Sequence, residues 1–302
     1  MAVTVQSNWA GDLLINYVTT EIQTLEPDLY FALLGVRRDV PKGYDNLVFP
    51  QTNQINATSV GTLTEGQDPT SVTWGSTAYK AGGTQKGLLV QVSDLLVRNS
   101  AIEVLEACVR QVKLAVARQI DQFIQTTVEA GTTVSYAGGK SARTSLGSGD
   151  LIDTTLYVKG IRALRANNVR PFEGRYYVAI AHPSQVADLM LNTSTGSWID
   201  VGRYTSTQEL LEGKMDHFRG ARVLESANVQ TFSSTVTVYP MLLLGEEAFG
   251  WGYFQLPEPI LVTTPDSNNP LNVYDSIGAK TTLGAIRFEE TRLNRLETAV
   301  SA

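Results

Sequence analysis

The chain has 302 residues, a net charge of −6, one cysteine and two histidines. This length suits one large domain or two modest ones with a sizeable core, and a single cysteine excludes an internal disulfide. So few cysteines and histidines exclude a zinc-type ligand cluster, and the acidic balance argues against a dedicated nucleic-acid binder, which would carry a clustered basic surface.

Residues 1–40 predict an arm. The apolar side chains of residues 13–25 fall on one helical face, and Pro27 ends that pattern because the residue before a proline avoids the helical region. Residues 29–34 predict one more helical turn, which Gly35 can end. These segments are too short to form a core alone, so we expect them to dock on another surface.

Residues 44–91 are rich in Thr, Ser, Gly, Gln and Asn. Short strand-like runs at 47–49, 72–74 and 88–92 predict a long β-hairpin with a flexible tip. A hairpin with so few apolar residues is marginal alone and needs another surface to lie on.

The strongest pattern predicts a long helix over residues 100–131. Ser100 and Glu103 have the spacing of a capping box, and Gly131 predicts the end. Steps of three and four residues separate the apolar positions, which are Ile102, Leu105, Val109, Val112, Val116, Ile120 and Phe123. Such a helix is roughly 45 Å long, and no second long helix is predicted to pair with it.

The next region alternates helices and strands. Asp153 begins a helix, residues 176–181 form a buried strand, and Ser184 can cap another helix. A short helix at 207–211 and strands at 220–226, 236–239 and 242–244 complete a compact domain of mixed type. The final part returns to strands at 260–263 and 276–291, which predicts an elongated second subdomain beside the long helix. The expected fold class is α+β.

No catalytic, cofactor or metal site is predicted. Residues 138–141 match the end of a phosphate-binding loop, but Val134 replaces the required glycine and the segment follows a helix end. His182 and His217 have no recognisable serine and acid partners for a triad, and Cys108 fits a small buried hydrophobe. No signal peptide or run of about 18 apolar residues occurs, so no membrane partner is expected.

The order of elements, together with the runs RQIDQF at 118–123, AIAHP at 179–183 and FRGARV at 218–223, resembles the HK97-type major capsid protein of tailed double-stranded DNA phages. The resemblance is in particular to the shorter subunits of the phage N-four group. The resemblance implies an N-arm at 1–45 and an extended loop at 46–98. It implies a peripheral domain at 99–150 with a spine helix at 100–131, an axial domain at 151–257, and return strands at 258–302 that complete the peripheral domain.

The resemblance also implies a function and partners. The subunit would self-assemble as hexamers and pentamers into an icosahedral shell that encloses the genome without sequence-specific binding, and it would be located in the virion. A portal protein is implied as a partner. A separate scaffolding protein is also implied, because the predicted arm starts close to residue 1. A decoration protein is left open. The protein would not be an enzyme and would need no cofactor.

Four residues on the implied loop are candidates for contacts between subunits. Trp74 and Tyr79 are the aromatic anchors, although packing on the chain's own helix is an equal alternative. Lys80 and Lys86 stand where some members of the family form Lys–Asn cross-links, but no acid to promote that reaction is evident. Two other functions remain open: an encapsulin-type compartment shell, and an α/β enzyme that uses His182 or His217.

Overall fold

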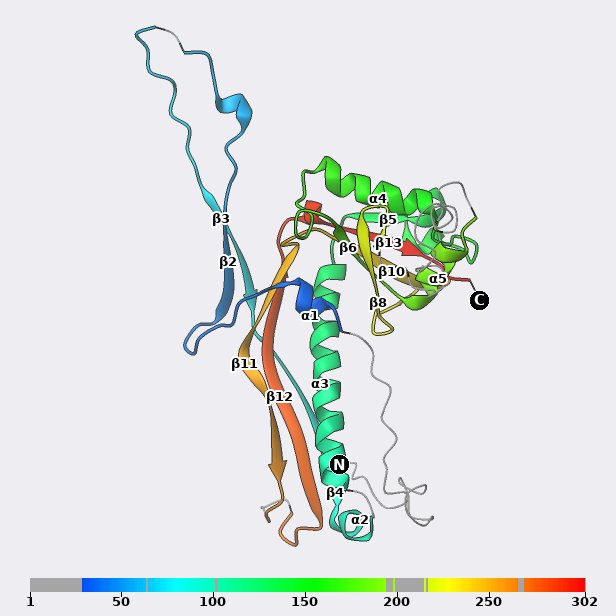
Figure 1. Cartoon of the computed structure of the whole chain (residues 1–302). Coiled ribbons are helices and arrows are strands. Elements are labelled where there is room, and N and C mark those ends of the chain that lie inside the picture. Colours follow the sequence, from blue (N-terminus) through cyan, green and yellow to red (C-terminus); the bar gives the residue numbers. More distant parts are fainter. Residues whose placement is uncertain are drawn as a thin grey trace.

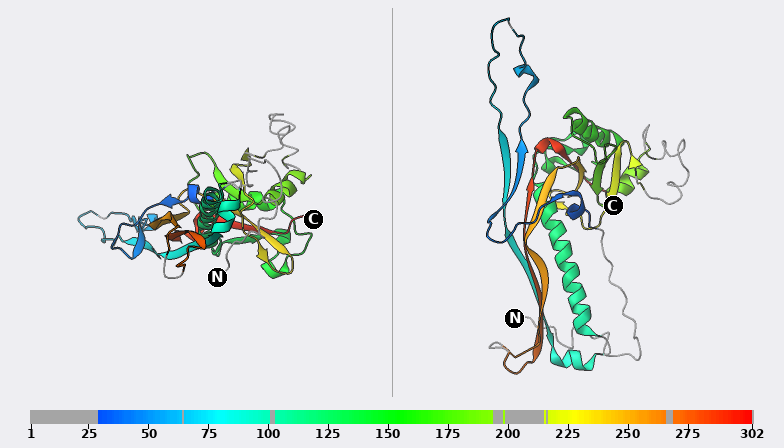
Figure 2. Two further views of the ribbon diagram at one scale, coloured as in Figure 1. Left: turned by 90° about the horizontal axis from the view of Figure 1, so that it is seen from below. Right: turned by 60° about the vertical axis from the view of Figure 1, so that its left-hand side comes forward.

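The structure is a computed structural model that describes residues 29–63, 65–100, 103–193, 198, 215, 217–265 and 269–301. These residues form a compact mixed sheet with helices, a long four-stranded sheet beside one long helix, and a two-stranded hairpin (Figure 1). The hairpin and the long sheet extend in opposite directions from the level of the compact part (Figure 2). The predicted α+β class is confirmed.

The described end of the arm docks on its own chain. Helix α1 (Phe31–Leu34) ends at Gly35 as predicted, and strand β1 (Val36–Arg37) follows it. Phe31 is buried, and the amide of Ala32 donates to the Asp121 carboxylate at 3.1 Å. The Trp251 indole donates to the carbonyl of Ala32 at 3.0 Å. The helix predicted at 13–25 lies outside the described residues.

The long helix is α3 (Val104–Glu129), slightly shorter than predicted. The predicted capping box is wrong, because Glu103 occupies the N-cap position and makes no side-chain cap bond. Ser100 instead ends a separate short helix, α2 (Asp94–Asn99), whose own cap is Ser93. Most of the buried apolar positions of α3 are four residues apart, so a single stripe of the helix faces the sheet.

The long sheet has the order β1-β11-β12-β4. Its three long strands are β11 (Phe249–Val262), β12 (Tyr274–Arg287) and β4 (Thr84–Ser93). Alternate residues of β12 are buried, and α3 covers this face of the sheet. The predicted strand at 88–92 therefore belongs to the long sheet. The hairpin consists only of β2 (Asn46–Thr52) and β3 (Ser76–Gly82).

The compact sheet has the order β5-β13-β10-β6-β8-β7, with β9 beside β10. Its strands are β5 (Val134–Tyr136), β6 (Tyr177–Ala181), β7 (His217–Phe218), β8 (Ala221–Glu225), β9 (Phe232–Ser233), β10 (Thr237–Leu244) and β13 (Leu293–Thr298). Two helices pack on it, α4 (Thr154–Ala166) and α5 (Pro183–Leu191). Short 3₁₀ turns lie at Ala57–Ser59, Ala137–Gly139, Arg143–Ser145 and Glu290–Arg292.

The compact sheet is covered on both faces. Tyr177 and Ala179 of β6 belong to a core with α4 and α5, whereas Val178 and Ile180 belong to a core that continues under α3 and the long sheet. This alternation explains why all five residues of β6 are buried. Asp153 caps α4 as predicted, accepting from the amide of Leu156 at 2.7 Å.

Three strands belong to a different part of the fold from the one that the predicted domain ranges gave them. β13 lies between β5 and β10 in the compact sheet, so residues 258–302 do not all complete the elongated part. β5 also joins the compact sheet, although it falls within the predicted peripheral range of 99–150. β11 enters the long sheet at Phe249, before the predicted boundary at 257. The predicted helix at 207–211 lies outside the described residues.

Candidate functional site

The base of the hairpin is anchored by aromatic side chains. Phe49 of β2 and Tyr79 of β3 are directly opposite each other across the two strands. Their rings lie 5.0 and 5.4 Å from the ring of Phe288, just beyond the end of β12. Because ring pairs at such distances attract beyond simple burial, this cluster fixes the direction in which the hairpin leaves the molecule.

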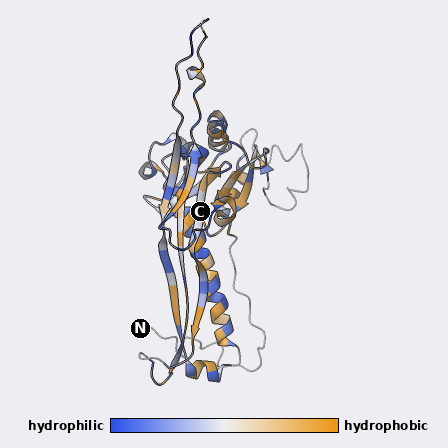
Figure 3. Cartoon of the chain, turned by 90° about the vertical axis from the view of Figure 1, so that its left-hand side faces the viewer, coloured by the Kyte–Doolittle hydropathy of each residue, from blue (hydrophilic) through white to orange (hydrophobic). Residues whose placement is uncertain are grey.

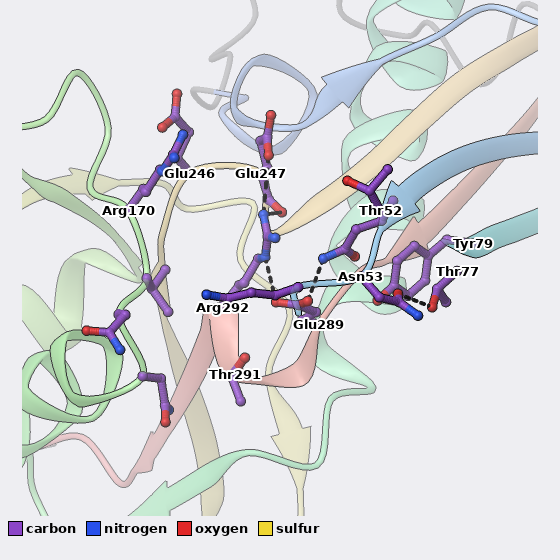
Figure 4. A pocket seen from close by; sticks show the side chains of 15 residues that line it. Thr52, Asn53, Thr77, Tyr79, Arg170, Glu246, Glu247, Glu289, Thr291 and Arg292 are labelled. Atoms are coloured by element: carbon purple, nitrogen blue, oxygen red, sulfur yellow. Dashed lines mark hydrogen bonds and ion pairs between the residues drawn. The ribbon is translucent and has the colours of Figure 1, made fainter. Parts of the chain in front are cut away.

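A polar cavity of about 570 Å³ lies between the hairpin base and the compact domain. Along its wall Gln51 donates to Glu289 at 2.5 Å, and Arg292 contacts Glu289 at 3.0 Å and Glu247 at 3.3 Å (Figure 4). The Arg292 guanidinium and the Gln51 amide hold the pKa of Glu289 below its usual value. This series of side-chain contacts, from Gln51 through Glu289 and Arg292 to Glu247, therefore links the hairpin to the loop after β10.

The tip of the hairpin spans residues 53–75 and has no core. Every described residue in it is exposed. The Trp74 indole donates to the carbonyl of Asn53 at 2.7 Å, which closes the base of the tip. The large apolar side chains that are exposed here are Ile55, Val60, Leu63, Val72 and Trp74. The sequence 53–75 contains two acidic residues, Glu65 and Asp68, and no lysine or arginine.

Exposed apolar side chains on a projecting, coreless segment mark a surface for contact with another molecule. A family model described as phage capsid protein matches residues 79–287, more than half of the chain. The chain belongs to the phage capsid protein family. It is a subunit of a capsid shell and is located in the virion.

Solved phage capsids share the fold of this capsid protein. The capsid of Ralstonia phage GP4 matches with a TM-score of 0.74 at 13% identity, covering 100% of this chain and 99% of that chain. The Helicobacter pylori bacteriophage KHP30 capsid matches with a TM-score of 0.73 at 11% identity, covering 99% and 98%. The Mycobacterium phage Che8 structure matches with a TM-score of 0.69 at 16% identity, covering 93% of this chain and 96% of that chain. A comparison with curated protein sequences finds no match.

These likenesses confirm the predicted HK97-type capsid fold. The four predicted contact residues differ in environment within this capsid subunit. Trp74 is 64% exposed, and Lys80 is exposed on β3. Tyr79 packs on Phe288 of its own chain, and burial together with the nearby Glu289 carboxylate raises its pKa. Lys86 is half-buried, with its ammonium 5.9 Å from the ring of Phe123 on α3.

The candidate residues for chemistry have structural roles in the capsid subunit. His182, not Ser184, caps α5 by accepting from the amide of Ser184 at 3.2 Å, and burial lowers its pKa. The ring of His217 packs edge-on against Tyr176 at 5.2 Å. Burial raises the pKa of Cys108, which opposes thiolate formation.

The segment at 138–141, which matches the end of a phosphate-binding loop, is also structural. Residues 137–139 form a 3₁₀ turn after β5, not directly after a helix as predicted, and no α-helix follows before α4. Over the described ranges, no group of three His, Cys, Asp or Glu side chains could hold a metal ion. No helix in the same ranges is long and apolar enough to cross a membrane.

The sequence did not predict the partners of the hairpin. Phe288, Glu289 and Arg292 lie more than 200 residues from Gln51 along the chain, and no local pattern connects them. The sequence analysis did single out Trp74. It missed the absence of lysine and arginine from residues 53–75, a signal that the sequence contains.

Proposed function

We propose that this subunit forms the hexamers and pentamers of an icosahedral shell that encloses the double-stranded DNA of a tailed phage. The observation that carries the proposal is the projecting hairpin, whose tip exposes five large apolar side chains and buries none of its described residues. A segment that cannot bury its apolar surface within its own subunit can bury it against a neighbouring subunit. We assign to the hairpin the role of an extended loop that lies on a neighbouring subunit.

The other parts receive roles consistent with this arrangement. Helix α3 with the long sheet forms the peripheral domain, and the compact sheet with α4 and α5 forms the axial domain around the capsomer axes. The chain is a structural protein without catalysis and without a cofactor. Its acidic charge is compatible with a DNA container, because counterions neutralise most of the packaged phosphates.

Assembly is proposed to involve other phage proteins. A separate scaffolding protein would set the curvature of the shell, and a portal protein would occupy one vertex. Closed shells of one uniform size from this chain expressed alone would contradict the scaffolding proposal.

The experiment that tests the function is expression of the whole chain, followed by sedimentation velocity and negative-stain electron microscopy. We expect concentration-dependent assembly into curved shells or their fragments, and antibodies against the chain should label DNA-filled phage particles. A chain that stays monomeric at every concentration would overturn the proposal. Native particles that hold protein cargo and no DNA would also overturn it, in favour of a compartment shell.

A further inference from the structure

The lower half of the long sheet has an open edge. β4 is the last strand of this sheet, and within the described residues it pairs only with β12. Two of its side chains, Leu88 and Leu89, are 41% and 62% exposed. Unpaired strand edges with apolar side chains recruit further strands.

A shallow apolar groove of about 370 Å³ lies beside this edge. In the registers of the sheet, Leu89 of β4 pairs with Gly278 of β12, which pairs with Ile260 of β11. The neighbours of Gly278 on β12, Ile277 and Ala279, are buried towards α3, so this row faces away from the helix. Leu89 and Ile260 form the walls, and Gly278 leaves the floor without a side chain. Apolar, orange stretches continue along these lower strands in Figure 3.

The groove opens towards the edge at Gly87. This residue pairs with Lys280, and it lies two residues before Leu89, so both face the outer side of the sheet. Without a side chain at Gly87, a large ring on an added strand can reach over β4 towards Gly278. A Cβ atom at Gly87 would lie 3.3 Å from the carbonyl oxygen of Ala279, so a larger residue would narrow this entrance.

The hairpin tip contains a segment suited to this edge. Residues 72–74, Val-Thr-Trp, have strand-forming side chains, yet they are not part of any strand. Val72 and Trp74 are 51% and 64% exposed, and residues two apart fall on one side of a strand. The hydrogen bond from Trp74 to Asn53 holds the indole in place and leaves its faces accessible.

The charges of the hairpin tip and of the β4 edge also favour contact between them. The tip carries Glu65 and Asp68 and no basic residue. Lys280 on β12 lies beside Gly87 on the groove side of the sheet, and the acid of that row, Glu258, is on β11, away from the open edge. An acidic segment added beside β4 therefore meets the lysine side of the groove.

We propose that residues 72–74 of one copy add as an antiparallel strand to the open edge of β4 in a second copy. Trp74 then lies over Gly87, Val72 beside Leu89, and Thr73 opposite Leu88 on the side that faces α3. Main-chain hydrogen bonds give this contact its affinity and the groove gives it side-chain specificity. The inference rests on the proposed function, since it names the surface that receives the hairpin.

Mixed cysteine cross-linking tests the proposal in assembled particles. Both chains carry Cys108→Ala; one adds Thr73→Cys, and the other adds a cysteine at one position from 86 to 90. The two chains are mixed, assembled and oxidised, and covalent dimers are measured on a non-reducing gel. We expect the highest yield with Leu88→Cys and low yields with Gly87→Cys and Leu89→Cys, because a disulfide needs Cα atoms about 4.4–6.8 Å apart with side chains on one face.

The control pairs Thr73→Cys with Thr155→Cys, an exposed position on α4, and should give no dimer. Assembled particles in which no β4 position cross-links above this control would overturn the inference and leave the proposed function intact. If neither the Cys108→Ala parent nor the unmodified chain assembles, both the inference and the proposed function are overturned.

A second variant tests the entrance of the groove. Gly87→Thr should lower assembly roughly tenfold at a fixed concentration, because the added side chain occupies the place of the Trp74 ring. Gly82→Thr is the matched control, since a Cβ atom there meets nothing within 4 Å. Circular dichroism of both unassembled subunits checks that they fold. Equal assembly of folded Gly87→Thr and Gly82→Thr subunits would count against the proposal.

Discussion

The compact sheet and the hairpin contrast two ways in which strands of one chain are stabilised. All five residues of β6 are buried, because helices cover one face of the compact sheet and the end of α3 covers the other. In β3, by contrast, only Tyr79 and Ala81 are even partly buried. The compact sheet is therefore stabilised by burial within the subunit, whereas the outer hairpin has little apolar burial within its own chain.

The long sheet is intermediate between these two. One face packs on α3, and the opposite face exposes Leu89, Ile260 and Val262. The number of covered faces is two in the compact sheet, one in the long sheet and almost none in the hairpin. Substitutions should therefore change subunit stability most in the compact sheet and least at the hairpin tip.

The largest effect is expected for Leu243→Ala in β10. This side chain is fully buried, and its Cδ1 would lie only 2.4 Å from a Cβ atom placed on Gly160 of α4. Removing it leaves a cavity between helix and sheet and should lower the free energy of unfolding by about 2–5 kcal/mol. Urea denaturation of the unassembled subunit measures this. The hairpin control Val72→Ala should change the free energy of unfolding by about 0.5 kcal/mol or less. Equal losses in the two variants would contradict the contrast between the compact sheet and the hairpin.

The next effect concerns Glu129, where α3 meets the compact sheet. This carboxyl is 3% exposed, accepts from the Gln125 amide at 2.5 Å, and lies near Arg143, Arg295 and Glu297. Burial raises its pKa to about 7, although the amide and the two arginines oppose the shift. Between its ordinary pKa near 4.5 and about 7 the folded subunit holds a proton that the unfolded chain has released. Stability should therefore fall as pH rises through this window, by an amount on the order of 3 kcal/mol.

The measurement is urea denaturation of the unassembled subunit at several values between pH 5 and pH 8. Glu129→Gln cannot ionise and keeps a similar shape, so the decline of stability with pH should become shallower in this variant. Parallel pH profiles for the two proteins would show that Glu129 does not cause the decline.

The elements predicted correctly are those whose signals are local. The repeat of apolar residues located α3, and the buried run at 176–181 located β6, because periodicity reports which face of an element is covered. The start of α3 was misplaced because Ser100 and Glu103 have capping-box spacing, yet residues 94–99 form a helix of their own that Ser100 ends. A cap motif does not show which of two adjacent helices it serves.

The elements misassigned to a sheet depend on contacts between distant parts of the chain. β13 follows β12 directly in sequence, which suggested that both complete one sheet. It enters the compact sheet, where buried Glu297 binds Arg143 at 2.6 Å and Arg295 at 2.7 Å. Burial of an ionised carboxylate requires such partners, and the partner 154 residues away could not be identified from the sequence.

The smallest effect on stability is expected where the effect on assembly is largest. β2 and β3 stay in register as far as the pair Thr52 and Ser76, so a two-residue Asn-Gly turn, which suits antiparallel strands, can replace residues 53–75. Because every described residue removed is exposed, the unfolding free energy should stay equal or rise slightly, since a shorter loop costs less closure entropy. Sedimentation velocity should then show a folded subunit that no longer assembles. Normal shells from the shortened chain would mean that the tip makes no essential contact, and a marked loss of stability in urea would mean that the tip supports its own subunit.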